Sequence, residues 1–307
     1  MSIYKPEGLL IDTFENQCSL KNYSSLLEAF QQKKILEARA IICDSSHNLI
    51  VNLGSMKGII PKDECAIGIS DGSVRDIAII SRVNKPVCFK ITGFDTDSNG
   101  NTVAILSRRL VQEQCQSEFV ENLRCGDIIP ARVTHLEPFG CFVDIACGIP
   151  SLIPIDAISV SRISHPRDRF RTGQDIYAIV KCFDGNRVCL SHKELLGTWE
   201  ENARLFSPGE TVAGIIRSIE SYGIFIELTA NLAGLAEPKD GVYIGQHASV
   251  YIKNLIPEKM KVKLIIVDSF EADYVTSYPT YFFNENHISR WQYSPSCSSR
   301  VLETVFE

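Results

Sequence analysis

Residues 138–145 read Pro-Phe-Gly-Cys-Phe-Val-Asp-Ile, and the interpretation of the fold starts from this stretch. Read as a β-strand, it alternates with a period of two: the apolar positions from Cys141 onward point one way, and Phe142 and Asp144 point the other. Gly140 allows the backbone to bend just before them. An aromatic ring on a face that meets water is costly unless a flat partner, such as a nucleic-acid base, stacks on it. A neighbouring loop that covers Phe142 is the alternative explanation.

The same pattern occurs again along the chain. Residues 221–228 read Ser-Tyr-Gly-Ile-Phe-Ile-Glu-Leu, which repeats the order aromatic, Gly, apolar, Phe, β-branched, acid, apolar at an offset of 222 − 139 = 83 residues. Residues 46–53, Ser-His-Asn-Leu-Ile-Val-Asn-Leu, form a fainter copy at 139 − 47 = 92 residues upstream. A motif repeated at a domain-sized interval indicates a repeated domain.

Length and composition agree with a globular protein of two to four domains. The chain has 307 residues, of which 45% are hydrophobic and 22% charged, and no apolar run approaches membrane-spanning length. We find no export signal at the start of the sequence, so we expect a cytoplasmic protein whose eleven cysteines are reduced. The net charge of −6 favours modest nucleic-acid affinity, based on stacking more than on a broad electrostatic surface.

Neither a metal site nor a cofactor site is expected. No Cys-x-x-Cys motif occurs, and the nearest cysteine pairs, Cys141/Cys147 and Cys182/Cys189, lack zinc-site spacing. The six histidines show no ligand spacing, and Gly-x-Ser-x-Gly, His-Glu-x-x-His and glycine-rich phosphate loops are all missing from the sequence. We therefore predict a protein that is not an enzyme and that takes no small-molecule substrate.

The order of short strands, turns and helical stretches predicts a mainly β protein with three tandem barrels and short helical connectors. A helix is expected at about residues 24–34, after an irregular start. The predicted divisions are an N-terminal extension with this helix (1–34), a degenerate first barrel (35–107), a helical connector (108–123), a second barrel (124–193), a second connector (194–206), a third barrel (207–270) and an aromatic-rich extension (271–307).

The repeated strand resembles the second strand of the S1-type RNA-binding domain, which is a five-stranded OB-fold. Its other motifs recur as an opening Gly-Asp strand at residue 126, a Gly-Leu turn at 233–237 and a closing Arg-Val-Cys-Leu-Ser strand at 187–191. The resemblance covers roughly residues 35–270. The whole chain is similar to the short ribosomal-protein-S1-like proteins of Gram-positive anaerobic bacteria.

The resemblance implies which residues would contact RNA. In the second barrel they are Phe139, Phe142, Asp184 and Arg187, and in the third they are Tyr222, Phe225, Lys261 and Lys263. The histidine that the family places after the third strand is replaced by Pro61, Pro154 and Glu237 in the three barrels. The first barrel carries His47 and Ile50 at the two aromatic positions, so we expect it to have lost RNA binding.

Residues 162–171 form the most basic stretch of the chain, with four arginines. Arginine binds phosphate and stacks on bases, so Arg162, Arg167 and Arg169 are candidate RNA contacts. A solvated loop, in which Asp168 neutralises a neighbouring arginine, is the alternative.

The tail after Phe270 holds eight aromatic residues, and residues 281–291 are expected to form a hairpin. We expect these aromatics to pack against the third barrel more readily than to stack on RNA.

Together these features predict a non-catalytic protein that binds single-stranded RNA, such as messenger RNA at or near the small ribosomal subunit. A scaffold that docks a ribosome or RNA-degradation component, with weak RNA binding, is the alternative. An accessory subunit of a nuclease is a third and more distant possibility.

Overall fold

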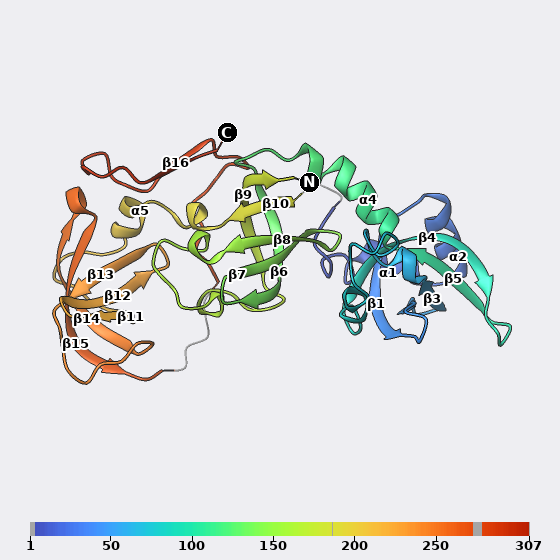
Figure 1. Cartoon of the computed structure of the whole chain (residues 1–307), viewed down its shortest axis with the longest axis horizontal. Coiled ribbons are helices and arrows are strands. Elements are labelled where there is room, and N and C mark those ends of the chain that lie inside the picture. The colour runs from blue at the N-terminus through green and yellow to red at the C-terminus, as the bar shows by residue number, and fades with distance from the viewer. Residues whose placement is uncertain (1–3, 186, 273–277, 307) are drawn as a thin grey trace. The chain divides into compact units, whose positions relative to one another are not determined.

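The computed structural model describes residues 4–185, 187–272 and 278–306, and its strands form three closed five-stranded barrels (Figure 1). Barrel 1 contains β1 (Leu36–Cys43), β2 (Leu49–Asn52), β3 (Lys57–Ile60), β4 (Pro86–Thr96) and β5 (Thr102–Ser107). Barrel 2 contains β6 (Ile128–Glu137), β7 (Gly140–Ala146), β8 (Ile149–Pro154), β9 (Asp175–Asp184) and β10 (Arg187–Ser191). Barrel 3 contains β11 (Thr211–Glu220), β12 (Gly223–Thr229), β13 (Leu232–Ala236), β14 (His247–Ile256) and β15 (Lys261–Phe270).

All three barrels have the same strand order. The first strand pairs with the second, the second with the third, the third with the fifth, and the fifth with the fourth, which closes the barrel on the first strand. The pair of third and fifth strands is parallel in each barrel. This is the five-stranded barrel topology of the OB-fold, so the predicted fold class is confirmed.

Helices lie before the barrels, between them and in the connections within them. The α-helices are α1 (Phe14–Leu20), α2 (Tyr23–Gln31), α3 (Ile77–Ile80), α4 (Arg109–Glu118) and α5 (Trp199–Ala203). The 3₁₀ helices are η1 (Lys62–Glu64), η2 (Val120–Asn122), η3 (Ile155–Ala157), η4 (Pro166–Asp168), η5 (Lys193–Leu196) and η6 (Pro257–Lys259). The expectation of an irregular start was wrong, because α1 begins where the Thr13 side chain accepts a hydrogen bond from the Asn16 amide.

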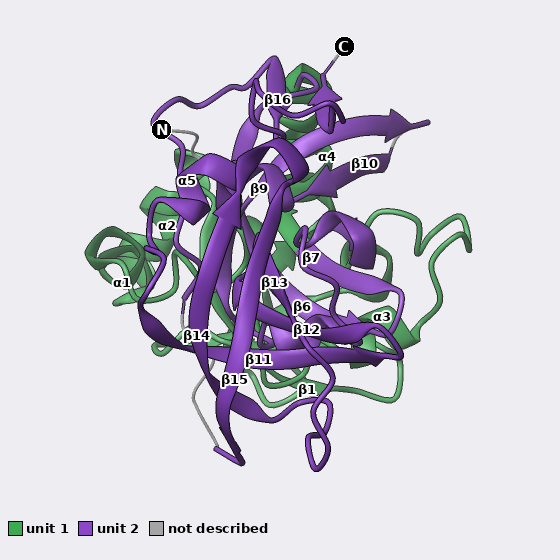
Figure 2. Cartoon of the chain, turned by 90° about the vertical axis from the view of Figure 1, so that its left-hand side faces the viewer, with its two compact units in different colours: residues 1–123, 144–150 green, residues 124–143, 151–307 purple. Residues whose placement is uncertain are grey.

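The chain divides into two compact units, coloured separately in Figure 2. Unit 1 comprises residues 1–123 and 144–150, and unit 2 comprises 124–143 and 151–307. Unit 1 is built on the core of barrel 1, where Leu49, Phe89 and Leu106 are fully buried. Within the described residues, we find no helix that combines the length and apolar character needed to cross a membrane.

The C-terminal segment packs in unit 2 but does not form the predicted hairpin. Strand β16 (Arg290–Gln292) pairs with β17 (Glu303–Val305), and the amide of Phe282 instead donates to the Leu195 carbonyl at 2.9 Å. Trp291, Tyr293 and Phe306 are buried in one cluster with the core of barrel 3 and Trp199, so the expected packing of tail aromatics is confirmed for these three. Tyr274 lies outside the described residues.

Candidate nucleic-acid interface

Two pairs of aromatic rings stand at the same place on barrels 2 and 3. Phe139 lies in the two-residue turn before β7 and meets Phe142 edge to face, with ring centroids 5.9 Å apart and planes at 89°. Tyr222, in the turn before β12, meets Phe225 at 6.1 Å and 87°. The first ring of each pair, the leading ring Phe139 or Tyr222, is 56% or 66% exposed, whereas Phe142 and Phe225 are half-buried. Each pair therefore offers one exposed ring, braced by a second, on which a base can stack.

A glycine follows the leading ring in both barrels because the third strand passes very close. A Cβ atom on Gly140 would lie 2.6 Å from the Ile153 carbonyl oxygen, and one on Gly223 would lie 2.7 Å from that of Ala236. The two carbonyls are at matching positions, since 153 − 140 and 236 − 223 both equal 13. The repeated glycine thus permits close approach of neighbouring strands rather than the local bend that we expected at Gly140.

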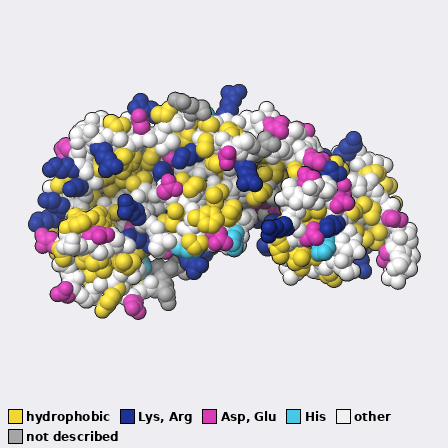
Figure 3. Space-filling view, viewed as in Figure 1, with side chains coloured by type: hydrophobic (Ala, Val, Ile, Leu, Met, Phe, Trp, Pro, Cys, Tyr) yellow, Lys and Arg dark blue, Asp and Glu magenta, His cyan; other side chains and the backbone are white. Residues whose placement is uncertain are grey.

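In barrel 3 a basic residue lies in the same line of cross-strand pairs as one ring of the aromatic pair. Phe225 on β12 pairs with Leu235 on β13, which pairs in turn with Lys263 on β15. Directly paired residues project to the same face, so the exposed Lys263 lies two strand spacings, about 10 Å, from Phe225. Lys261 is also exposed and lies two residues earlier on the same strand. Figure 3 shows several Lys and Arg side chains in the left-hand region of the view, where barrel 3 lies.

Barrel 2 brings Asp184 and Arg187 to the corresponding end of its last two strands. They are directly paired across β9 and β10, and both are exposed. Two residues further along β10, Cys189 pairs with Leu152 on β8, as Lys263 pairs with Leu235 in barrel 3. Arg187 and Cys189 thus hold in barrel 2 the positions of Lys261 and Lys263. The predicted aromatic contacts and these charged residues all lie on strands or turns of their own barrels.

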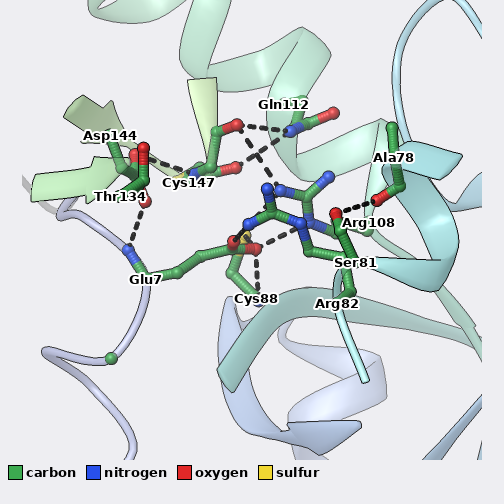
Figure 4. A network of polar contacts seen from close by, with 12 residues as sticks. Glu7, Ala78, Ser81, Arg82, Cys88, Arg108, Gln112, Thr134, Asp144 and Cys147 are labelled. Carbon is green, nitrogen blue, oxygen red and sulfur yellow. Dashed lines mark hydrogen bonds and ion pairs between the residues drawn. The ribbon is translucent and has the colours of Figure 1, made fainter. Parts of the chain in front are cut away.

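The predicted orientation of Asp144 was wrong, because its carboxylate is buried. It accepts hydrogen bonds from the amides of Glu7 at 2.7 Å and Gly148 at 3.0 Å, as Figure 4 shows for the Glu7 contact. Burial, reinforced by the negative charge of Glu7, raises the pKa of Asp144 to about 7. Asp144 is therefore part of the interior of unit 1 and no candidate for RNA contact.

Glu7 is held in this interior by two arginines. The Arg108 guanidinium donates to both carboxylate oxygens, at 2.6 and 3.0 Å, and Arg82 approaches at 3.3 Å (Figure 4). Burial by itself raises the pKa of Glu7, but the charge and hydrogen bonds of Arg108 outweigh it and lower the pKa below its ordinary value. The N-terminal segment is thereby fixed within unit 1.

The equivalent acid of barrel 3, Glu227, is buried in an ion-pair network that the sequence did not predict. Its Oε2 accepts from Arg169 Nη2 at 2.6 Å and from Arg217 Nε at 2.7 Å. Arg217 Nη1 also lies 3.5 Å from Asp168 Oδ2. Arg169 and Asp168 belong to the basic loop between β8 and β9 of barrel 2, whereas Arg217 and Glu227 belong to β11 and β12 of barrel 3.

This network corrects the interpretation of the basic loop. Arg169 is buried and engaged with Glu227, so it is neither an accessible RNA contact nor part of a solvated loop. Arg162, Arg167 and Arg171 are exposed. A groove of about 600 Å³ adjoins the network, lined among others by Arg167, Phe170, His192, Arg217 and His247, with Asp168 and Glu227 opposing the basic charge.

Barrel 1 lacks an aromatic pair at the matching positions. His47 has a left-handed backbone (φ 63°) and lies 3.9 Å from Asp76, and Ile50 is half-buried. Ile50 offers no π-face to a base. Barrel 1 therefore differs from barrels 2 and 3 at the surface where those two carry their aromatic pairs.

Comparison with known proteins finds the family of one domain of the chain. Residues 123–193, which cover barrel 2, match the family model described as the S1 RNA binding domain. The chain contains an S1-type domain, as its sequence motifs indicated.

The similarity extends well beyond this domain to ribosomal proteins. The chain is 26% identical over 264 residues to the small ribosomal subunit protein bS1 of Staphylococcus aureus and 28% identical over 261 residues to the small ribosomal subunit protein bS1 homolog of Bacillus subtilis. These matches cover 80% and 82% of the chain but 64% of each relative, so the chain matches under two thirds of their length. A solved multidomain protein with nucleic acid binding domains from Streptococcus pneumoniae aligns over 78% of this chain and 75% of its own, at 15% identity and a TM-score of 0.26.

Proposed function

We propose that the protein binds single-stranded RNA through the aromatic pairs of barrels 2 and 3. The observation that carries this proposal is the repetition of one surface, Phe139/Phe142 and Tyr222/Phe225, with the same edge-to-face geometry and an exposed leading ring. Every base has a π-face, so such surfaces bind unpaired bases with little sequence preference. The match of barrel 2 to the S1 RNA binding domain supports the same conclusion.

Phosphate contacts would come from the last strands of the same barrels. Lys263 lies in the same line of cross-strand pairs as Phe225, and Lys261 lies beside it. In barrel 2, Arg187 supplies the single basic group at the corresponding site, opposite the acid Asp184. We infer that barrel 3 makes the larger electrostatic contribution and that barrel 2 relies more on stacking.

The RNA in question would be messenger RNA at or near the small ribosomal subunit. This part of the proposal is supported by the similarity to proteins named small ribosomal subunit protein bS1.

A second function is favoured for barrel 1. Ile41, Ile42, Ile77 and Ile80 are exposed large apolar residues there, and the aromatic pair is replaced by His47 and Ile50. Apolar side chains of this kind suit contact with another protein better than contact with phosphate. Barrel 1 would then dock a ribosomal component while barrels 2 and 3 hold the RNA.

The proposal is tested by titrating the full chain against a fluorescently labelled single-stranded RNA and a duplex of the same length at two salt concentrations. We expect the single strand to bind more tightly, because its bases are free to stack, and binding to weaken as salt rises. Equal binding of both RNAs, or affinity that does not respond to salt, would argue for the scaffold function instead.

A further inference from the structure

Two cysteines lie opposite each other on the surface of barrel 2. Cys182 on β9 and Cys189 on β10 are direct partners in the antiparallel ladder. The next pair of the same phase is Asp184 and Arg187, so both pairs project to the same outward face. Cys182 is exposed and Cys189 half-buried, which leaves the pair open to a small reagent from solution.

The two cysteines are neighbours across the ladder and influence each other electrostatically. Burial raises the pKa of Cys189, and the neighbouring Cys182 thiol raises it further through its charge and through a side-chain hydrogen bond. Cys18 and Cys297 are also exposed cysteines, which makes them useful internal comparisons for reactivity. By contrast, thiols such as Cys88 and Cys115 are buried within unit 1.

We propose that Cys182 and Cys189 form a reversible disulfide across β9 and β10, which makes this pair a redox modification site. A small-molecule disulfide is the oxidant. One protein thiolate attacks a sulfur of the small disulfide and releases one small thiolate; the second protein thiolate then attacks the mixed disulfide and releases the other. Two protein thiols thus become one disulfide with loss of two protons, and the small disulfide is reduced to two thiols.

The ladder geometry explains why this bond would be reversible. Opposed residues of an antiparallel pair have Cα atoms about 4.5–5.5 Å apart, within the range that a disulfide spans. Their Cβ atoms, however, are about 4.5–5.5 Å apart, whereas a disulfide needs about 3.5–4.5 Å, so the strands must move together. Exposed and strained disulfides are the ones that small thiols reduce readily.

The position of the pair connects it to the candidate interface. Cys189 pairs with Leu152 as Lys263 pairs with Leu235, so the disulfide would form where barrel 3 presents a lysine. That the bond would lie on an RNA-binding surface rests on the proposed function. Formation of the bond is independent of the proposed function and is measured without RNA.

The test treats the full chain with increasing oxidised glutathione, blocks the remaining thiols by alkylation and maps tryptic peptides by mass spectrometry. Cleavage after Lys181, Arg187 and Lys193 places the two cysteines in separate peptides, 182–187 and 188–193, which the disulfide would join. We expect the joined peptides at an oxidant concentration at least about tenfold below that at which Cys18 or Cys297 carries glutathione, because the second thiol is held in place. Reduced glutathione should separate them again.

Cys182→Ser is the matched control. In this variant the joined peptides should be lost, and the half-buried Cys189 should take up glutathione at a concentration no lower than that for the exposed Cys297. An unchanged circular dichroism spectrum would show that the variant is folded, and Cys189→Ser gives the reciprocal check. The proposal is overturned if the wild-type protein carries glutathione on Cys18 and Cys297 while Cys182 and Cys189 remain unlinked.

Discussion

Arg169 and Glu227 form a buried ion pair, Nη2 to Oε2 at 2.6 Å, that joins the basic loop between β8 and β9 of barrel 2 to strand β12 of barrel 3. Arg217 donates to the same carboxylate from the neighbouring strand β11. Glu227 is two residues beyond Phe225, so the network supports the strand that presents one of the two aromatic pairs. The structure thus separates arginines that hold unit 2 together from basic residues that remain available to RNA.

Removal of the Arg169 charge should destabilise unit 2. Arg169→Gln leaves Glu227 buried with one partner fewer, and loss of one member of a buried pair costs about 3–5 kcal/mol. Both tryptophans, Trp199 and Trp291, lie in unit 2, so urea unfolding followed by tryptophan fluorescence reports on it. The exposed Arg167→Gln is the control and should change the free energy of unfolding by less than about 0.5 kcal/mol. Equal effects of the two substitutions would contradict the structural role of Arg169.

The stacking residues of barrels 2 and 3 should contribute more to RNA affinity than the residue at the matching position of barrel 1. Phe142→Ala together with Phe225→Ala should weaken binding of single-stranded RNA about tenfold or more, because each stacked base contributes about 1–3 kcal/mol. Ile50→Ala, at the matching position of barrel 1, should leave the affinity unchanged. Fluorescence anisotropy of labelled RNA gives both values. The stacking account fails if the folded double variant binds as tightly as the wild type.

Lys263 should contribute to affinity through phosphate. Lys263→Gln should lower affinity to a similar extent for all RNA sequences and reduce the slope of log affinity against log salt by about one. Lys57→Gln, in β3 of barrel 1, should not alter the slope. A slope that stays the same in the Lys263 variant would mean that this lysine does not meet the RNA backbone.

The stability of unit 2 should fall in mild acid because of His192. Its ring is buried against Phe170 and Tyr281, and burial lowers its pKa to about 4 from an ordinary value of 6.5. Because the unfolded state binds this proton more readily, the stabilisation is complete above about pH 6.5 and is lost as the pH falls toward 4. The shift of 6.5 − 4 = 2.5 corresponds to about 3 kcal/mol.

The measurement is the free energy of unfolding from tryptophan fluorescence at several pH values between 4 and 7. His192→Gln should flatten the dependence in this range, whereas the exposed His135→Gln should keep it. If His192→Gln retains the full pH dependence, another group is responsible.

The sequence predicted the features that depend on residues close together along the chain. The repeated pattern of residues 138–145 and 221–228, with its fainter copy at 46–53, indicated three barrels, and the first two stretches indicated the aromatic pairs, since period-two alternation determines which side chains share a face. It did not predict contacts between distant segments. Asp144 was expected in water because its partner, Glu7, is 137 residues away, and Arg169 was expected on the surface because Glu227 is 58 residues away. The charge of such residues is visible in the sequence, but their burial follows from how whole elements pack.

The thiols of barrel 2 offer a footprint of bound RNA. Cys189 holds the position of Lys263, so RNA on the proposed surface should slow alkylation of Cys182 and Cys189. Alkylation of Cys18 and Cys297 should proceed at the same rate with and without RNA. Equal protection of all four cysteines would indicate a general effect of RNA, not contact at barrel 2.

In the proposed function, RNA bases lie on the aromatic pairs of barrels 2 and 3. The most direct measurement is photocrosslinking of a single-stranded RNA containing 4-thiouridine to the full chain, followed by mass spectrometry of the crosslinked peptides. We predict that crosslinks concentrate on the turns and strands that carry Phe139/Phe142 and Tyr222/Phe225, with none at His47 or Ile50. Crosslinks confined to barrel 1, or absent from both aromatic pairs, would contradict the account.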